Sequence, residues 1–262
     1  MADLLKGKRG LITGIANNRS IAYGIASVFR AEGAELAFGC QMDVFGKKVQ
    51  PLADEMGVKL VLDYNVLDDA STKTAFDTMG TAWGSIDFAI HGIAYSDKAE
   101  LTGDFSKTTR ENFKNSMDIS CYSLIDMARN AAPLMTEGGS ILSLTYQGSR
   151  RATPWYNVMG VAKAALETTT LYLANELGPQ GIRVNCISPG PMKTLSGAAI
   201  GGARKTFRFT EANAPLRKNA TLEAIGGTAA YLCSDYGDCT TGEIIMVDGG
   251  YNILGMPQPD NL

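Results

Sequence analysis

The chain has 262 residues, of which 45% are hydrophobic and 19% are charged, and this composition excludes a disordered chain and a coiled coil. A formal net charge of −3 lacks the basic surplus expected of a general nucleic-acid-binding protein. The length is near the upper end for one domain, and the chain contains no linker-like, repeated or low-complexity tract. We therefore expect residues 1–262 to form a single domain.

The cysteines are scattered and odd in number, and no two of them have Cys-x-x-Cys spacing. We expect them to be reduced and mostly buried thiols. Residues 1–8 lack the apolar run of a signal peptide, and no stretch approaches the ~18 apolar residues of a membrane span. The sequence thus predicts a soluble, cytoplasmic protein, and its lone histidine, His91, has no partners for a metal site.

Short apolar runs alternate with longer amphipathic segments along the whole chain. Strands are expected at Gly10–Thr13, Glu35–Cys40, Lys59–Asp63, Ile86–His91, Ser140–Tyr146, Arg183–Ser188 and Glu243–Val247. Helices are expected at Ile21–Glu32, Val44–Met56, Ser71–Trp83, Arg110–Leu134, Tyr156–Leu177 and Leu222–Ser234. Consecutive apolar positions are typical of strands that are covered on both faces. The pattern predicts an α/β fold, a Rossmann-type doubly wound, seven-stranded parallel sheet with helices on both faces.

The turn after the first expected strand, TGIANNRSIAYG at 13–24, is suited to a dinucleotide although it is not GxGxxG. Gly14 can supply the tight turn, and the small Ser20 lets the helix that begins at Ile21 lie close to a pyrophosphate. Backbone N–H groups at that helix start then face the anion. Glycine-containing turns occur in many α/β proteins, but the position after the first strand favours the cofactor interpretation.

Residues after the next strands indicate which dinucleotide binds. An acidic residue at the end of the second strand usually meets a free ribose 2′-OH, and a basic residue meets a 2′-phosphate. Gln41 fits neither pattern, and Lys47 and Lys48 follow a helical turn later. We favour NADH. After the third strand, Asn65 and Val66 are expected to frame the adenine.

Small residues follow the fourth strand, where Gly92 and Ile93 permit a close approach to the cofactor. His91 at the end of that strand is expected to be structural. Further along, Tyr156 and Lys163 are seven positions apart, which on a helix places them on one face ~10.5 Å apart along the axis. A cation there favours negative charge near the phenol and can bind ribose hydroxyls. Taken alone, this pair is better explained by an ordinary amphipathic helix with one aromatic residue and one lysine.

The ordered segments after the strands resemble the short-chain dehydrogenase/reductase superfamily over essentially the whole chain, down to VDGG at 247–250. The usual Tyr-x3-Lys is absent, because Met159 lies four positions before Lys163. The glycine turn also departs from the usual superfamily pattern. In both departures the chain resembles the bacterial enoyl-acyl carrier protein reductases of type II fatty-acid synthesis. Tyr146, YNVMG at 156–160 and Lys163 resemble the Tyr…Tyr-x6-Lys signature of that family, and SPGPMKTL at 188–195 resembles its nicotinamide-binding segment. Asn65 departs from the Asp found in many relatives.

The resemblance implies one dinucleotide-binding and catalytic domain that transfers hydride from NADH to the β-carbon of a trans-2-enoyl thioester. Tyr156 then donates a hydrogen bond to the developing enolate oxygen, Lys163 holds the nicotinamide ribose, and Tyr146 shapes the acyl site. Substrate contacts are expected from Ser96, Tyr146 and Tyr156. Cofactor contacts are expected from Gly14, Ser20, Ile21, Gln41, Asn65, Val66, Gly92, Ile93, Lys163, Pro191, Met192 and Thr194. A homotetramer is implied as well.

The interval at about 192–220 has no clear periodicity. Long insertions beyond a strand end are often functional lids, and we expect this one to be a mobile substrate lid. Its basic residues, with Glu211 as the one acid, are Lys193, Arg204, Lys205, Arg208, Arg217 and Lys218. Such a segment could receive an acidic acyl carrier protein, and a solvated helical face explains it equally well. One rival function is the reduction of a ketone or a 3-oxoacyl thioester, but the Tyr-x6-Lys spacing argues against it. The other alternative is a non-catalytic protein that senses a dinucleotide.

Overall fold

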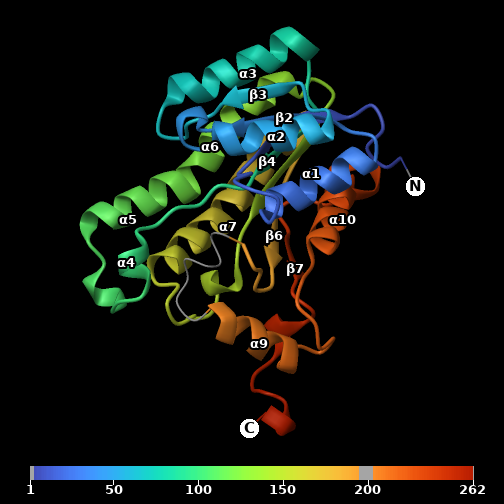
Figure 1. Ribbon diagram of the computed structural model, residues 1–262. Coiled ribbons are helices and arrows are strands. Elements are labelled where there is room, and N and C mark those ends of the chain that lie inside the picture. The colour runs from blue at the N-terminus through green and yellow to red at the C-terminus, as the bar shows by residue number, and fades with distance from the viewer. Residues whose placement is uncertain (1–2, 195–202, 262) are drawn as a thin grey trace.

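The computed structural model describes residues 3–194 and 203–261, and these contain one parallel sheet (Figure 1). The strand order is β3-β2-β1-β4-β5-β6-β7. The strands are β1 (Arg9–Thr13), β2 (Glu35–Cys40), β3 (Leu60–Asp63), β4 (Phe88–His91), β5 (Gly139–Leu144), β6 (Ile182–Pro189) and β7 (Ile244–Val247). The predicted seven-stranded, doubly wound sheet is confirmed, and each strand begins and ends within two residues of its predicted bounds.

The predicted helices appear in the expected order in the described part of the chain. The observed helices are α1 (Ile21–Ala31), α2 (Lys47–Met56), α3 (Asp69–Trp83), α4 (Lys98–Leu101), α5 (Arg110–Met117), α6 (Ser123–Ala131), α7 (Val158–Leu177), α9 (Ala203–Asn213) and α10 (Leu222–Cys233). Of these, α4 and α9 are additional helices that the sequence pattern did not predict. The single helix expected at Arg110–Leu134 is divided by a π-helical turn at Asp118–Tyr122 and ends in a 3-10 turn at Ala132–Leu134. Pro133 lies in that last turn, where its missing N–H ends the α-helical hydrogen bonding.

Two hydrophobic layers sandwich the sheet, and adjacent strand residues belong to different layers. In β1, Leu11 packs with α3, α6 and α7, whereas Ile12 packs with α1, α2 and α10. Both side chains are fully buried. The alternation of side chains across a strand therefore explains why the strands have apolar residues at consecutive positions.

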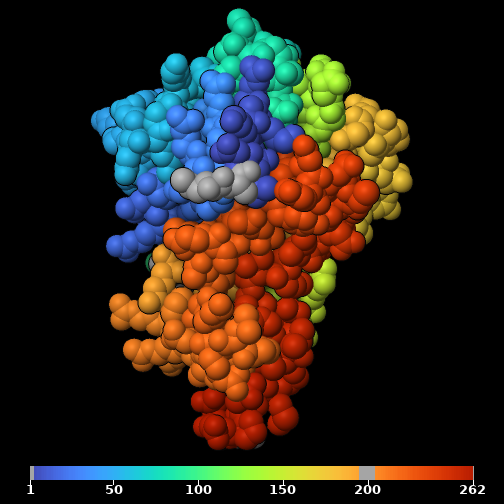
Figure 2. All heavy atoms as spheres, turned by 90° about the vertical axis from the view of Figure 1, so that its right-hand side faces the viewer, coloured from blue at the N-terminus to red at the C-terminus, as the bar shows by residue number. Residues whose placement is uncertain are grey.

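The loops that follow the strands all lie at one edge of the sheet, because the strands are parallel. The strand order reverses between β1 and β4, which is the switch point where α/β sheets bind ligands. Beyond β6 and β7, α9 and the C-terminal residues form a projection at one end of the molecule (Figures 1 and 2). The backbone N–H of Gln258 donates to Oδ1 of Asn213 at 2.8 Å, which fixes the C-terminal segment to α9.

The structure also bears on the cysteines and on membrane-spanning helices, the two features considered from composition. The five cysteines are free thiols, of which only Cys239 is exposed. Among the described residues, no helix is both long enough and apolar enough to span a bilayer.

Candidate active site

The first site feature is a close crossing of the chain at the ends of β1 and β4. Gly14 has φ +88°, and a Cβ placed on it would lie 2.1 Å from the carbonyl oxygen of Gly92. A Cβ on Gly92 would lie 2.5 Å from the carbonyl oxygen of Thr13. Only glycine fits at either position, and the predicted tight turn at Gly14 is confirmed.

The start of α1 completes this turn. Ser20 is the N-cap residue, and its Oγ accepts hydrogen bonds from the backbone N–H groups of Ala16 and Asn17 at 3.0 and 3.2 Å. The serine therefore shapes the loop, while Ile21 begins an 11-residue helix. A helix N-terminus beside a turn without side-chain bulk fits the pyrophosphate of a dinucleotide.

The predicted adenine-end residues come together. Nε2 of Gln41 donates to Oδ1 of Asn65 at 2.9 Å, although the two residues are 24 positions apart. Oδ1 of Asn65 also accepts from the backbone N–H of Leu67, and Val66 packs against the hydrophobic layer formed with α3 and α6. The side chains of Gln41 and Asn65, which follow β2 and β3, are thus neutral and joined by a hydrogen bond.

The remaining predicted cofactor and substrate residues also follow strand ends. Oγ of Ser96 donates to Oδ1 of the buried Asn112 at 3.2 Å, which fixes the loop after β4 to α5. Ile93 is half-buried in the same loop, and after β6 Pro191 and Met192 are half-buried. Thr194 is the last described residue there. Of the lid expected at about 192–220, residues 195–202 lie outside the described residues, and 203–213 form α9.

Tyr146 and Tyr156 are in direct contact. Their ring centroids are 5.0 Å apart with an interplanar angle of 65°, an edge-to-face arrangement. Tyr156 is 7% exposed and packs against Leu101 and Met159. Burial raises the pKa of both phenols, so each remains protonated and can donate a hydrogen bond.

The structure corrects the predicted helical placement of Tyr156. Helix α7 begins at Val158, so the seven-residue helical spacing from Tyr156 to Lys163 does not apply. Tyr156 lies in a turn between Trp155 at φ +63° and Asn157 at φ +41°. Nδ2 of Asn157 donates to the carbonyl oxygens of Glu100 and Gly103, both at 2.9 Å. These distant contacts hold a backbone conformation that non-glycine residues rarely adopt.

Lys163 is buried in α7, and its Nζ donates to the carbonyl oxygen of Leu144 at 2.7 Å. Burial lowers the pKa of Lys163 to about 8, against the opposing influence of Cys186, Cys121 and Glu167. The amino group therefore titrates close to neutral pH.

His91 is fully buried at the end of β4. Its Nδ1 and Nε2 lie 2.8 Å from the hydroxyl oxygens of Ser143 and Ser123, respectively. Burial, and then the charge of Lys163, lowers the pKa of His91 to about 3. The neutral ring therefore joins β4 to β5 and α6, in agreement with the expected structural role.

Sequence reasoning missed Glu167, a buried carboxylate one helical turn after Lys163. Its Oε1 accepts from Thr145 at 2.8 Å and from Ser149 at 2.6 Å, and its Oε2 accepts from Nε of Arg150 at 3.1 Å. A glutamate four positions after a lysine is typical of an exposed helix face, so this cluster could not be predicted from the sequence.

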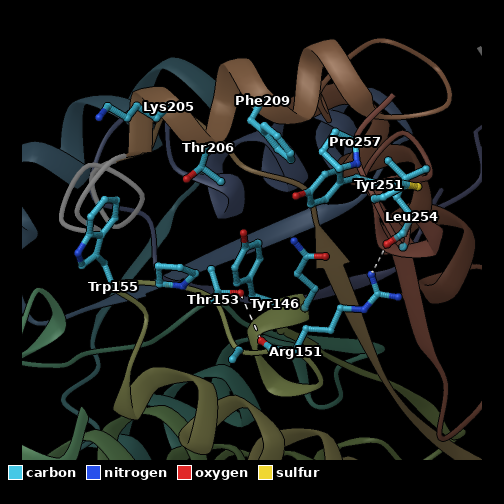
Figure 3. Close-up of a pocket in the computed structure, with 15 residues that line it drawn as sticks. Tyr146, Arg151, Thr153, Trp155, Lys205, Thr206, Phe209, Tyr251, Leu254 and Pro257 are labelled. Atoms are coloured by element: carbon cyan, nitrogen blue, oxygen red, sulfur yellow. Dashed lines mark hydrogen bonds between the residues drawn. The ribbon is translucent and has the colours of Figure 1, made fainter. Parts of the chain in front are cut away.

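A cavity of about 490 Å³ opens beside Tyr146 (Figure 3). Phe209 of α9 and Tyr146 lie on opposite sides of it, and Tyr251 packs perpendicular to Phe209 at a centroid distance of 6.1 Å. Nη1 of Arg151 donates to the carbonyl oxygen of Leu254 at 2.9 Å, which closes one wall with the C-terminal segment. The largely aromatic and aliphatic lining suits an acyl chain. The sequence pattern did not identify the C-terminal wall, which depends on tertiary contacts.

Comparison with known proteins agrees with this geometry. The sequence profile of the family described as Enoyl-(Acyl carrier protein) reductase matches residues 14–252. A relative from Rhizobium meliloti (strain 1021), named enoyl-(acyl-carrier-protein) reductase (NADH) 2, is 51% identical over 257 residues, covering 98% of this chain and 96% of the relative. The enoyl-(acyl-carrier-protein) reductase of Anaplasma phagocytophilum, solved in complex with NAD, is 48% identical with a TM-score of 0.94, covering 97% of each chain. The Bacillus cereus enoyl-acyl carrier protein reductase, solved with NADP+ and indole naphthyridinone, is 45% identical with a TM-score of 0.95, covering 97% of this chain and 99% of that one. The chain belongs to the enoyl-(acyl carrier protein) reductase family.

Proposed function

We propose that this protein reduces the 2,3 double bond of trans-2-enoyl-acyl carrier protein with NADH, in fatty-acid elongation. Family membership over nearly the whole chain and the names of its relatives support this activity. The observation in the structure that carries it is the Tyr146–Tyr156 contact at the wall of an apolar cavity. A protonated phenol and an acyl-sized cavity suit the oxyanion and the acyl chain of an enoyl thioester.

The residues at the carboxyl edge fit a nicotinamide dinucleotide, since Gly14 and Gly92 leave no side-chain bulk where α1 begins. We assign the pyrophosphate to Gly14, Ser20 and Ile21, the adenine end to Gln41, Asn65 and Val66, and the nicotinamide end to Gly92, Ile93, Pro191, Met192 and Thr194. When bound, NADH supplies the hydride that is added to the substrate β-carbon. The protein supplies position and electrostatic field.

Tyr156 is assigned the hydrogen bond to the thioester oxygen, where negative charge develops. Its raised pKa keeps the proton on the phenol, which therefore acts as a donor rather than as a base. One preorganised donor of this kind is worth about 3–4 kcal/mol in the transition state. Tyr146 is assigned to the acyl site, because it lines the cavity and packs edge-to-face on Tyr156. Ser96 is proposed as a further substrate contact.

Lys163 is assigned to the nicotinamide ribose. The carbonyl of Leu144 accepts one of its three N–H bonds and orients the ammonium group. Its positive charge, buried at 5% exposure, favours negative charge on the nearby substrate.

We further propose that an acyl carrier protein binds at the basic segment that includes α9. Arg204, Lys205 and Arg208 are exposed on α9, and Lys205 lines the cavity. Lys193 lies 4.3 Å from the ring centroid of Phe207 and packs on that helix. Reversing the charge at Arg204 and Lys205 should raise KM for a carrier-bound enoyl substrate far more than for a short thioester analogue. Equal effects on both substrates would refute carrier docking at α9.

A homotetramer built through α5 and α7 is proposed as well. Phe113 on α5 and Leu171 and Tyr172 on α7 are exposed apolar side chains, with Tyr172 75% exposed. Exposed apolar groups on neighbouring helices are typical of interfaces. Light scattering during gel filtration tests the assembly, and cell fractionation tests the predicted cytoplasmic location.

The deciding experiment follows NADH absorbance with a trans-2-enoyl thioester, with NADPH and an acetoacetyl thioester in parallel. Oxidation of NADH with the enoyl substrate alone is the expected result. Activity only on the acetoacetyl substrate would make the protein a 3-oxoacyl reductase. Activity on neither substrate, with tight NADH binding, would favour the non-catalytic sensor.

A further inference from the structure

A carboxylate lies at the end of β2, although that strand does not supply it. Asp63 is the last residue of β3 and pairs with Cys40, the last residue of β2. Its Oδ1 accepts a hydrogen bond of 3.0 Å from the backbone N–H of Met42. The Asp63 side chain therefore reaches the segment immediately after Gln41.

This segment has a defined place in dinucleotide-binding sheets. The residue after the second strand faces the 2′ position of the adenosine ribose, where an acidic group accepts from a free hydroxyl and a basic group binds a phosphate. In this chain Gln41 is neutral and bonded to Asn65. The carboxylate that binds the Met42 N–H therefore comes from the neighbouring strand.

The Met42 N–H is also the kind of donor that a phosphate uses. Backbone N–H groups in turns bind anions, and here the turn is the π-helical segment Met42–Gly46. Because the Asp63 carboxylate occupies this N–H, a second anion would have to displace it or lie beside it. Like charges at such short range repel each other.

The charge of Asp63 is not neutralised by an ion pair among the described residues. Its influence on its surroundings is visible at Cys40, where burial, and then the charge of Asp63, raises the thiol pKa to about 11. Lys47 and Lys48 are exposed on α2, one helical turn beyond Gln41.

We propose that Asp63 is a specificity-determining residue for the cofactor, because its carboxylate, held by the Met42 N–H, accepts a ribose 2′-hydroxyl and rejects a 2′-phosphate. This inference rests on the proposed use of NADH. It explains how a chain without an acidic residue at the end of β2 discriminates against NADPH.

Asp63→Asn separates this role from a purely structural one. The asparagine Oδ1 can still accept from Met42 N–H, so the turn keeps its hydrogen bond while the charge is removed. Asp43→Asn is the matched control, because Asp43 is an exposed carboxylate in the same turn. Removing either charge changes the net charge of the protein equally.

The experiment measures Kd for NAD+ and NADP+ by titration calorimetry, with ADP-ribose and its 2′-phosphate as a second pair without the nicotinamide. In Asp63→Asn we expect the ratio of the NADP+ Kd to the NAD+ Kd to fall about tenfold, equivalent to about 1.4 kcal/mol. In Asp43→Asn the ratio should stay within about twofold of the wild type. An unchanged ratio in Asp63→Asn, or an equal fall in both variants, would overturn the proposal.

A second measurement needs no variant. If repulsion excludes the phosphate, the ratio of the two Kd values in the wild type should decrease as salt rises from about 0.05 to about 0.5 M, because salt screens exposed charges. A ratio independent of salt would contradict exclusion by charge. Binding of NAD+ to the wild type tests the cofactor assignment itself, so failure of that assignment is distinguishable from failure of the Asp63 proposal.

Discussion

The hydroxyl of Thr145 donates a hydrogen bond of 2.8 Å to the carboxylate of Glu167. Thr145 directly precedes Tyr146, and Glu167 lies one helical turn after Lys163. The same carboxylate oxygen accepts from Ser149 at 2.6 Å, so both ends of the short segment around Tyr146 are fixed to α7. Glu167 therefore couples the tyrosine at the cavity wall to the helix that carries the lysine.

Replacing Glu167 by alanine should loosen this segment. The hydroxyls of Thr145 and Ser149 lose their acceptor, and each buried group left unpaired costs about 1–3 kcal/mol. We expect KM for the enoyl thioester to rise and kcat to fall, while the Kd for NADH changes little, because α1 and its turn are untouched. Steady-state kinetics and NADH titration measure the two effects.

The matched variants are Glu167→Gln and Arg150→Gln. Glutamine keeps an oxygen for both hydroxyls, so Glu167→Gln should retain a near wild-type KM. Arg150 binds the other carboxylate oxygen and its side chain is 52% exposed, so its loss should have a small effect. If the glutamine variant behaves like the alanine variant, the charge of Glu167 matters and the positioning account is wrong.

Replacing Tyr156 by phenylalanine should lower turnover about 10²–10³-fold, because one preorganised donor to the developing oxyanion is removed. NADH binding should be unchanged. Tyr146→Phe keeps the edge-to-face ring contact and should have a smaller effect on kcat. Single-turnover kinetics with an enoyl thioester measure the chemical step, and an unchanged rate in Tyr156→Phe would refute the oxyanion role.

The fold could be predicted from the sequence because its determinants are local. Adjacent apolar residues such as Leu11 and Ile12 indicate a strand that is buried on both faces, and strand–helix alternation then gives a parallel sheet. The cofactor edge could also be predicted, since Gly14, Gln41 and Gly92 each follow a strand. Their clustering is a consequence of the topology alone.

The position of Tyr156 outside the helix could not be predicted, because its cause is not local. The turn depends on Asn157, whose side chain binds backbone carbonyls more than 50 residues away. Glu167 and the cavity wall at Leu254 escaped detection for the same reason. Glu167 on α7 binds residues of the loop after β5, and Leu254 binds Arg151, which lies 103 positions earlier.

Replacing Gly14 by alanine should destabilise the protein more than positive φ alone explains. Gly84 provides the control, because it has φ +77° with no heavy atom within 4 Å of an added Cβ, whereas an added Cβ at Gly14 meets Gly92. Gly84→Ala should cost about 1 kcal/mol, and Gly14→Ala should cost at least about 3 kcal/mol and weaken NADH binding. Urea unfolding gives both values, and equal losses would show that the close crossing is not rigid.

The low pKa of Lys163 predicts a pH dependence of both cofactor use and stability. Burial lowers this pKa to about 8 from its ordinary value of 10.5. Between these two values the unfolded chain binds a proton that the folded chain does not, so the contribution of Lys163 makes the free energy of unfolding rise with pH across that window. Activity should instead fall as pH rises through about 8, because the ammonium charge of Lys163 is lost there.

We therefore expect kcat/KM for NADH to decline above about pH 8. The groups that influence Lys163 are Cys186 on β6, Cys121 before α6, Glu167 on α7 and His91 on β4. The pKa of Cys186 is raised to about 12 and that of His91 is lowered to about 3, so neither titrates in this range. Lys163→Arg keeps its charge to higher pH and should remove the decline, even if its absolute rate is lower. A decline that persists unchanged in Lys163→Arg would assign the titration to another group and remove Lys163 as its source.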